Sequence, residues 1–212
     1  MDKEIFLIKL YEILLSSFGK QNWWPGETRD EIIIGAVLTQ NTNWKNVEKA
    51  ISNLKTNNCL SLECLRNASS DTIASLIRPA GFYKQKTSTL KEIAYYFTNN
   101  FNRNIKKKPY KFREELLSLK GIGNETGDSI LLYAFDIPFF VVDAYTKRIL
   151  IRHKIIGNHD SYLEIQSLFH SFIPKNAYVY NEYHALMVKL GKEYCLKKEP
   201  KCNTCPIKKG GL

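Results

Sequence analysis

The stretch that decides the fold of this chain reads Leu116-Leu117-Ser118-Leu119-Lys120-Gly121-Ile122-Gly123-Asn124-Glu125-Thr126-Gly127-Asp128. Two helix-forming segments flank its Gly-Ile-Gly turn, since glycine accepts the positive φ angles that end one helix before the next begins. The backbone N–H groups that open the second helix carry partial positive charge from the helix dipole. The pattern predicts a helix, a hairpin and a second helix, with a phosphate-binding site at Lys120, Gly121, Ile122 and Gly123. A glycine-capped turn without a ligand is the alternative.

An apolar run, Phe139-Phe140-Val141-Val142, follows this stretch and ends at Asp143. Residues 144–151 have a helical pattern, so Asp143 taken by itself is an N-cap that accepts a hydrogen bond from a backbone N–H two or three residues on. A lone carboxylate in this place is also a candidate for general-base or electrostatic catalysis.

The composition indicates a globular, basic protein. Its 212 residues are 44% apolar, enough for one sizeable core or two small ones. The formal charge of +10 favours nucleic acid as a partner over an anionic membrane. Six cations within eleven acid-free residues lead into the hairpin helix: Arg103, Lys106, Lys107, Lys108, Lys111 and Arg113. They are predicted to contact a nucleic-acid backbone, with a solvated basic loop as the alternative.

Targeting and redox signals are weak. No apolar stretch reaches the roughly 20 residues that span a bilayer, and Asp2 and Glu4 interrupt any signal-peptide pattern. A cytoplasmic location is therefore expected, with nucleoid association in a prokaryote. Five cysteines, an odd number, argue against a disulfide framework and favour free thiols or metal ligands.

The periodicity of apolar residues is helical throughout, without the alternation that strands require. Gly, Pro and Asn clusters divide the chain into about ten helices. The sequence thus predicts an all-α fold.

The motif L-x-G-I-G-x-x-T-G, followed by Val141-Val142-Asp143, resembles the helix-hairpin-helix DNA glycosylase superfamily, whose best-known branch is endonuclease III. The resemblance implies two helical domains that flank a DNA-binding cleft. Residues 21–135 would form the central domain with the hairpin, and residues 1–20 would join 136–212 in a second domain. The implied partner is double-stranded DNA containing damaged bases, bound by a monomer.

In that family the aspartate at the position of Asp143 is catalytic, and its carboxylate stabilises the oxocarbenium character of the sugar while water attacks. Lyase members carry a lysine just after the hairpin, whose amine forms a Schiff base and breaks the backbone. Glu125 stands there in this chain, so the resemblance implies a monofunctional glycosylase. Glu125 itself has either a role in the base pocket or a role as a first-turn acid that complements the helix dipole.

The three tryptophans are Trp23, Trp24 and Trp44, and sequence alone favours core packing for them. Together with Leu38-Thr39-Gln40-Asn41-Thr42, they resemble the 3-methyladenine DNA glycosylase branch. That resemblance places all three in a base pocket in which Trp23 and Trp44 sandwich the flipped base. A cationic alkylated purine would gain cation–π attraction there, about 0.5 to 2 kcal/mol per contact.

Two further residues fall on DNA-contacting positions of the family. Gln40 matches the glutamine that fills the gap left by the flipped nucleotide, and Phe82 of Gly81-Phe82-Tyr83 matches the wedge between base pairs. Read without the resemblance, they are a helix-end polar residue and a core aromatic.

The C-terminal cysteines Cys195, Cys202 and Cys205 have spacing that resembles the iron–sulfur loop of endonuclease III. The fourth cysteine of that loop would fall on Gly211. The resemblance implies a [4Fe-4S] cluster; another metal, or a loop that binds nothing, are the alternatives.

The implied function is base excision repair in which a hydrolase removes alkylated purines, such as 3-methyladenine, from duplex DNA. One alternative is an endonuclease III-like glycosylase with or without lyase activity, acting on oxidised pyrimidines or mismatched bases. The other is a non-catalytic helix-hairpin-helix DNA-binding module.

Overall fold

The computed structural model describes residues 2–102 and 107–212, and these residues form helices and connecting loops without any strand. The predicted all-α class is confirmed. The chain divides into two compact units, one of residues 1–24 and 138–212 and the other of residues 25–137. The described part holds twelve α-helices, compared with about ten expected from the sequence, and four of them are only four to seven residues long.

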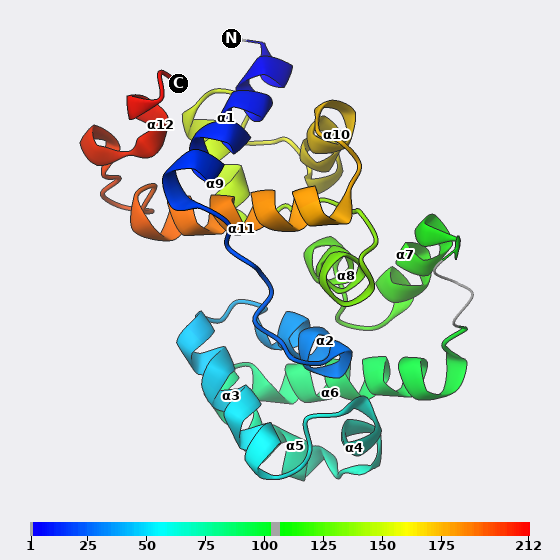
Figure 1. The fold of residues 1–212 in the computed structure, drawn as a ribbon. Coiled ribbons are helices and arrows are strands. Elements are labelled where there is room, and N and C mark those ends of the chain that lie inside the picture. The colour runs from blue at the N-terminus through cyan, green and yellow to red at the C-terminus, as the bar shows by residue number, and fades with distance from the viewer. Residues whose placement is uncertain (1, 103–106) are drawn as a thin grey trace. The chain divides into compact units, whose positions relative to one another are not determined.

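Unit 2, residues 25–137, holds the hairpin. Its helices begin at side-chain caps that the sequence supplies: Thr28 accepts from the Glu31 amide and Asn43 from the Asn46 amide. The elements are α2 Arg29–Leu38, α3 Trp44–Thr56, α4 Leu62–Asn67, α5 Ser70–Leu76, the 3₁₀ turn η1 Arg78–Ala80, α6 Tyr83–Tyr95, the π-helix η2 Tyr96–Asn100, α7 Pro109–Ser118, α8 Asn124–Ser129 and the π-helix η4 Ile130–Ala134 (Figure 1).

Helices α2 and α6 form the centre of unit 2. Helix α2 packs against α3, α6, α8 and η4, and α6 packs against α4 and α5. An aromatic cluster attaches α7 to this core, since the buried ring of Phe112 lies 5.0 Å from Phe135 and 5.5 Å from Phe101 between ring centroids. The helix that leads into the hairpin is therefore anchored by apolar burial.

Unit 1, residues 1–24 and 138–212, is built around the longest helix of the described chain, α11 Ala177–Glu193, which packs against α9 Ala144–Arg152 and α1 Lys3–Phe18. The Tyr183 hydroxyl donates to the Leu7 carbonyl at 2.8 Å, and the ring of Phe140 stacks on Phe169 at 3.6 Å between centroids. The remaining elements are α10 Tyr162–Phe172, the 3₁₀ turn η5 Cys202–Thr204 and α12 Pro206–Lys209.

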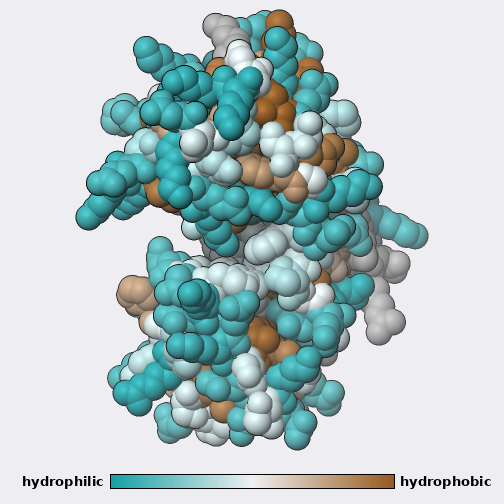
Figure 2. Space-filling view, turned by 60° about the vertical axis from the view of Figure 1, so that its left-hand side comes forward, coloured by the Kyte–Doolittle hydropathy of each residue, from teal (hydrophilic) through white to brown (hydrophobic). Residues whose placement is uncertain are grey.

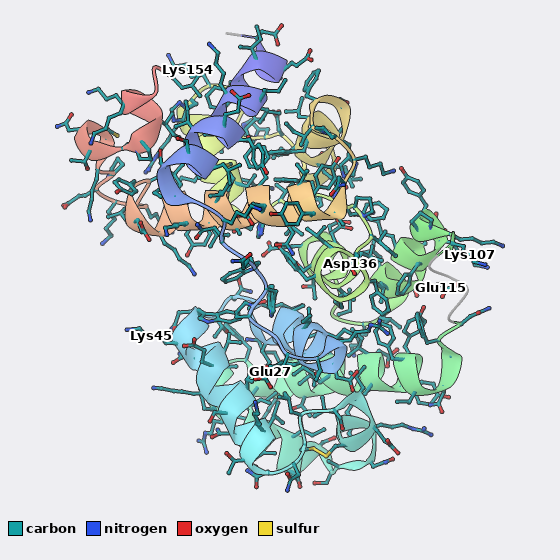
Figure 3. All side chains as sticks on the ribbon, in the orientation of Figure 1. Glu27, Lys45, Lys107, Glu115, Asp136 and Lys154 are labelled. Atoms are coloured by element: carbon teal, nitrogen blue, oxygen red, sulfur yellow. A yellow bond between two sulfur atoms is a disulfide. The ribbon has the colours of Figure 1, made fainter. Side chains whose placement is uncertain are left out.

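Two of the five cysteines form a disulfide, which corrects the expectation that all would be free thiols or ligands. Cys59 follows α3 and Cys64 lies in α4, and their sulfur atoms are bonded, with Cα atoms 5.2 Å apart (yellow bond in Figure 3). The short turn at Ser61 brings the two side chains together. A count of cysteines could not reveal this, because it says nothing about which pairs are neighbours in space.

Polar and charged side chains cover most of the face drawn in Figure 2, with smaller apolar areas between them. Among the described residues, no helix is both long enough and apolar enough to cross a membrane.

Candidate active site and DNA-binding loops

The helix–hairpin–helix of unit 2 consists of α7, the turn 119–123 and α8. Gly121 has φ +87, and a Cβ there would lie 2.1 Å from the Thr89 hydroxyl oxygen of α6. Only glycine satisfies both the backbone angle and the close approach. Lys120, Gly121 and Gly123 are exposed. The predicted contact surface of the hairpin therefore consists of a lysine and bare backbone.

Ile122 differs from its hairpin neighbours. Its side chain is buried beside Gly127, and its amide donates to the Leu119 carbonyl at 3.1 Å. Its side chain therefore stabilises the turn from inside, and the predicted phosphate contacts rest on the exposed residues around it.

Arg113 of the basic run has a structural role. Its guanidinium makes two bonds to the fully buried Asp128 carboxylate, at 2.6 and 3.0 Å, and a third to the Asn124 side chain at 2.9 Å. This pair joins α7 to α8, so the guanidinium that was predicted to contact DNA holds the motif together instead. Lys107, Lys108 and Lys111 are exposed, and Lys107 precedes α7 (Figure 3). Arg103 and Lys106 lie outside the described residues.

Gln40 follows α2 and reaches the hairpin. Its amide nitrogen donates to the Gly121 carbonyl at 3.0 Å and to the Thr126 hydroxyl at 2.9 Å. A gap-filling role would require this side chain to exchange these bonds for contacts to DNA.

Phe82 precedes α6 in a conformation that non-glycine residues rarely adopt. Its φ is +46 and ψ is 29, and its side chain is 62% exposed. Exposing an aromatic ring on a left-handed backbone costs the folded state free energy without any packing gain. The core reading of Phe82 is wrong, and its exposure is compatible with the predicted wedge.

Asp143 is the N-cap of α9 in unit 1, where its Oδ1 accepts from the Thr146 amide at 2.7 Å. Its Oδ2 lies 3.7 Å from Nε2 of His184, a buried residue of α11. Burial by itself raises the pKa of the Asp143 carboxyl, but His184 and the Thr146 bonds outweigh burial and hold that pKa below its usual range. The cap and an ionised carboxylate are therefore compatible roles.

His184 was not singled out by the sequence. It lies 41 residues beyond Asp143 on a helix whose buried face is mostly apolar and aromatic, with Glu182 as a further buried charged residue. A lone histidine in such a pattern gives no local signal, because only the packing of α11 against α9 brings it to the carboxylate.

The other predicted site residues divide between the units. Glu125 lies exposed in the first turn of α8 in unit 2. Trp23 and Trp24 belong to unit 1, and Trp44, whose indole N–H donates to Glu48 at 2.9 Å, belongs to unit 2. All three tryptophans have intermediate exposure, so none of them is fully buried. The Lys192 amine lies 5.7 Å from the Trp23 ring centroid, within cation–π range.

The C-terminal cysteines do not fit a cluster as they are arranged. Cys195 Sγ accepts from the Arg152 guanidinium at 3.1 Å, and Cys202 is exposed. In the described ranges, no group of three or more His, Cys, Asp or Glu side chains could hold a metal ion. Hydrogen bonds hold the loop instead, since Arg148 donates to the Cys195 carbonyl at 2.8 Å and Arg152 to the Leu196 carbonyl at 2.7 Å.

We expect protein purified without air to contain less than one iron–sulfur cluster per chain, because only three thiols are present and they do not converge. Elemental analysis for iron and zinc, with the visible spectrum, measures this. Four irons per chain with broad visible absorption would contradict the prediction and would require the loop to rearrange around the cluster.

Comparisons with known proteins agree with this architecture. A family model described as HhH-GPD superfamily base excision DNA repair protein matches residues 34–175. A relative in Methanocaldococcus jannaschii, named provisionally as a DNA repair glycosylase, is 47% identical over 207 residues, covering 95% of this chain and 94% of the relative. Endonuclease III of Sulfolobus acidocaldarius is 28% identical over 186 residues, covering 86% and 82%.

Two solved structures are also similar. The 3-methyladenine DNA glycosylase of H. pylori bound to 1,N6-ethenoadenine has a TM-score of 0.76 at 30% identity, covering 91% of this chain and 98% of the other. An endonuclease III trapped as a covalent DNA intermediate has a TM-score of 0.83 at 22% identity, covering 97% and 93%, a likeness of fold. Since the family model spans well over half of the residues and the M. jannaschii relative matches along nearly the whole length, the chain belongs to the HhH-GPD superfamily of base excision DNA repair proteins.

Proposed function

We propose that this protein is a monofunctional DNA glycosylase that removes alkylated purines, with 3-methyladenine as the representative substrate, from duplex DNA. Membership in the superfamily and the names of its relatives, a DNA repair glycosylase and an endonuclease III, support the general activity on DNA. The likeness to the H. pylori 3-methyladenine glycosylase supports the choice of base.

The observation that carries the proposal is the buried, ionised carboxylate of Asp143. Breaking an N-glycosidic bond leaves oxocarbenium character on the sugar, and a fixed negative charge stabilises that cation as it develops. The same carboxylate can orient or deprotonate the attacking water. Since the Thr146 bonds and His184 stabilise the charged form, Asp143 is prepared for this role before DNA binds.

An alkylated purine is a suitable substrate for a site in which one carboxylate is the main catalytic group. Its leaving base is cationic and unstable, so its departure needs no strong general acid. Three partly exposed indoles, one of which already has an ammonium group over its ring, provide faces on which a cationic base can stack. A neutral base would lack that attraction.

The DNA contacts of the proposal come from unit 2. Exposed Lys120 and the backbone of Gly121 and Gly123 would bind phosphates, and Phe82 would separate the base pairs beside the flipped nucleotide. A binding module without catalysis would need the hairpin alone, whereas this chain also holds an ionised carboxylate inside unit 1.

A panel of duplexes, each with one lesion, tests the substrate. We expect base release from 3-methyladenine duplexes to exceed release from oxidised pyrimidine and mismatch duplexes, with strand breaks only after alkali treatment. Faster release of an oxidised pyrimidine or a mismatched base would replace the alkylpurine proposal with the endonuclease III-like alternative.

We also expect borohydride to trap no covalent protein–DNA adduct, because Glu125 stands where lyases have a lysine and a carboxylate cannot form a Schiff base. Denaturing electrophoresis of borohydride-treated reactions measures this, with an endonuclease III as the positive control. An efficient adduct would contradict the monofunctional proposal. Loss of that adduct in Lys120→Ala would then identify the exposed hairpin amine as the nucleophile.

A further inference from the structure

Lys86, near the start of α6, is a buried lysine that the reaction proposed above does not use. Its side chain is 2% exposed, and its Nζ has three oxygen acceptors: the Leu38 carbonyl at 2.8 Å, the Ala80 carbonyl at 2.9 Å and the Thr42 hydroxyl at 2.6 Å. An ammonium group has three protons, so these partners satisfy it completely.

The two carbonyl groups close the elements that precede the DNA-contacting loops. Leu38 is the last residue of α2, two residues before Gln40, and Ala80 is the last residue of η1, two residues before Phe82. Carbonyls at helix ends lack intrahelical donors and carry partial negative charge, which an ammonium group complements. The Lys86 amide also donates to the Phe82 carbonyl at 3.0 Å.

Thr42 strengthens the link between the two loops. Besides accepting from Lys86, its hydroxyl donates to the Ala80 carbonyl across the gap between the loops. Gln40, in the same loop as Thr42, bonds to the hairpin through Gly121 and Thr126. Three segments distant in sequence are thus connected by one set of hydrogen bonds inside unit 2.

Burying the charged ammonium group of Lys86 costs free energy. Burial lowers the pKa of Lys86 to about 8, so the protonated form is destabilised relative to water. A methionine would fill similar space without that cost. What the lysine adds is the set of directed bonds to both loops.

We propose that Lys86 is a positioning residue that holds the Gln40 loop and the Phe82 loop in one fixed arrangement, so that both enter the DNA duplex together. The inference rests on the proposed function, in which these loops contact DNA. It predicts that Lys86 affects DNA distortion more than it affects folding.

Lys86→Met tests this against a matched control, Lys91→Met. Lys91 lies on the same helix and donates to the Arg66 carbonyl at 2.9 Å and to the Ala68 carbonyl, so it also holds a helix end but one remote from these loops. Thermal unfolding followed by circular dichroism compares the stability of the two variants.

The functional readout uses a duplex with a tetrahydrofuran abasic analogue beside 2-aminopurine, whose fluorescence rises when it is unstacked. We expect Lys86→Met to weaken the fluorescence response and to slow base release by about tenfold to a hundredfold. Lys91→Met should stay within about twofold of the parent. In a Phe82→Ala background, Lys86→Met should have a smaller effect than in the parent, because part of its effect acts through the Phe82 loop.

Equal effects of Lys86→Met and Lys91→Met would overturn the inference. It would also be overturned if the effect of the double variant equalled the product of the separate Lys86→Met and Phe82→Ala effects. If Lys86→Met does not fold, Thr42→Val tests the inference in its place, since it removes the hydroxyl that accepts from Lys86 and keeps the shape of the side chain. It should lower the response about two- to fivefold, and no change would count against the proposal. The tetrahydrofuran duplex contains no base to release, so a wrong lesion assignment leaves this test intact.

Discussion

Replacing Asp143 with asparagine is expected to slow base release by about two to three orders of magnitude. Asparagine keeps the size of the side chain and can still cap α9 through its amide oxygen, so folding should be preserved. The change removes the negative charge that would face the oxocarbenium ion. Single-turnover base release from a 3-methyladenine duplex measures the effect, and binding to a tetrahydrofuran duplex should hold or tighten.

Asp2→Asn is the matched control, because Asp2 is also an N-cap aspartate of unit 1, accepting from the Glu4 amide at 2.8 Å, but it is exposed at the start of α1. This variant should release base at the parent rate. An Asp143→Asn protein with parent activity would show that the carboxylate acts only as a cap.

His184→Asn tests whether activity depends on the protonation state of the Asp143 carboxyl. His184 lowers the pKa of the Asp143 carboxyl, so its removal should raise that pKa. The parent should keep this carboxylate ionised well below neutral pH, and activity should fall only as pH drops through the depressed pKa. In His184→Asn the acid limb of the pH–rate profile should move to higher pH. An unmoved limb would mean that His184 has no influence on the catalytic carboxylate.

Replacing Trp44 with alanine is expected to cost about 1 to 3 kcal/mol of transition-state stabilisation, roughly tenfold to a hundredfold in rate, for a cationic base. Phenylalanine at this position should recover part of the loss, since its ring stacks but is less electron-rich. The loss should be larger for 3-methyladenine than for the neutral lesion hypoxanthine. Rates of base release from the two duplexes measure the difference.

Tyr95→Ala provides the control, because Tyr95 is an exposed aromatic residue of the same unit, at the end of α6. It should leave both rates unchanged. Trp44 is only partly buried in the first turn of α3, so its replacement should leave the thermal unfolding of the protein nearly intact. Equal losses on both lesions would remove cation–π stacking as the basis of selectivity.

Local features of the fold could be predicted because they depend on neighbours along the chain. The hairpin needs glycine at 121 for its positive φ, and Asp143 caps the helix that begins one residue later. The helix boundaries follow from the same short-range rules, although helices as short as α4 and α5 give little periodicity from which to predict them.

Burial was harder to predict from residue type. Phe82 was read without the resemblance as a core aromatic but is 62% exposed, while Lys86 is almost fully buried. Hydrophobicity sets only an average tendency, and a lysine can be buried when helix ends supply its acceptors.

The sequence by itself determined the all-α class, the hairpin and the cap at Asp143, since each follows from interactions within about four residues. Only the tertiary structure decided which groups meet across helices. It paired Asp143 with His184, directed Arg113 to Asp128 instead of leaving it for DNA, and joined Cys59 to Cys64. The physical reason is that such pairs form when apolar burial packs one helix against another. The sequence around one partner therefore does not identify the other.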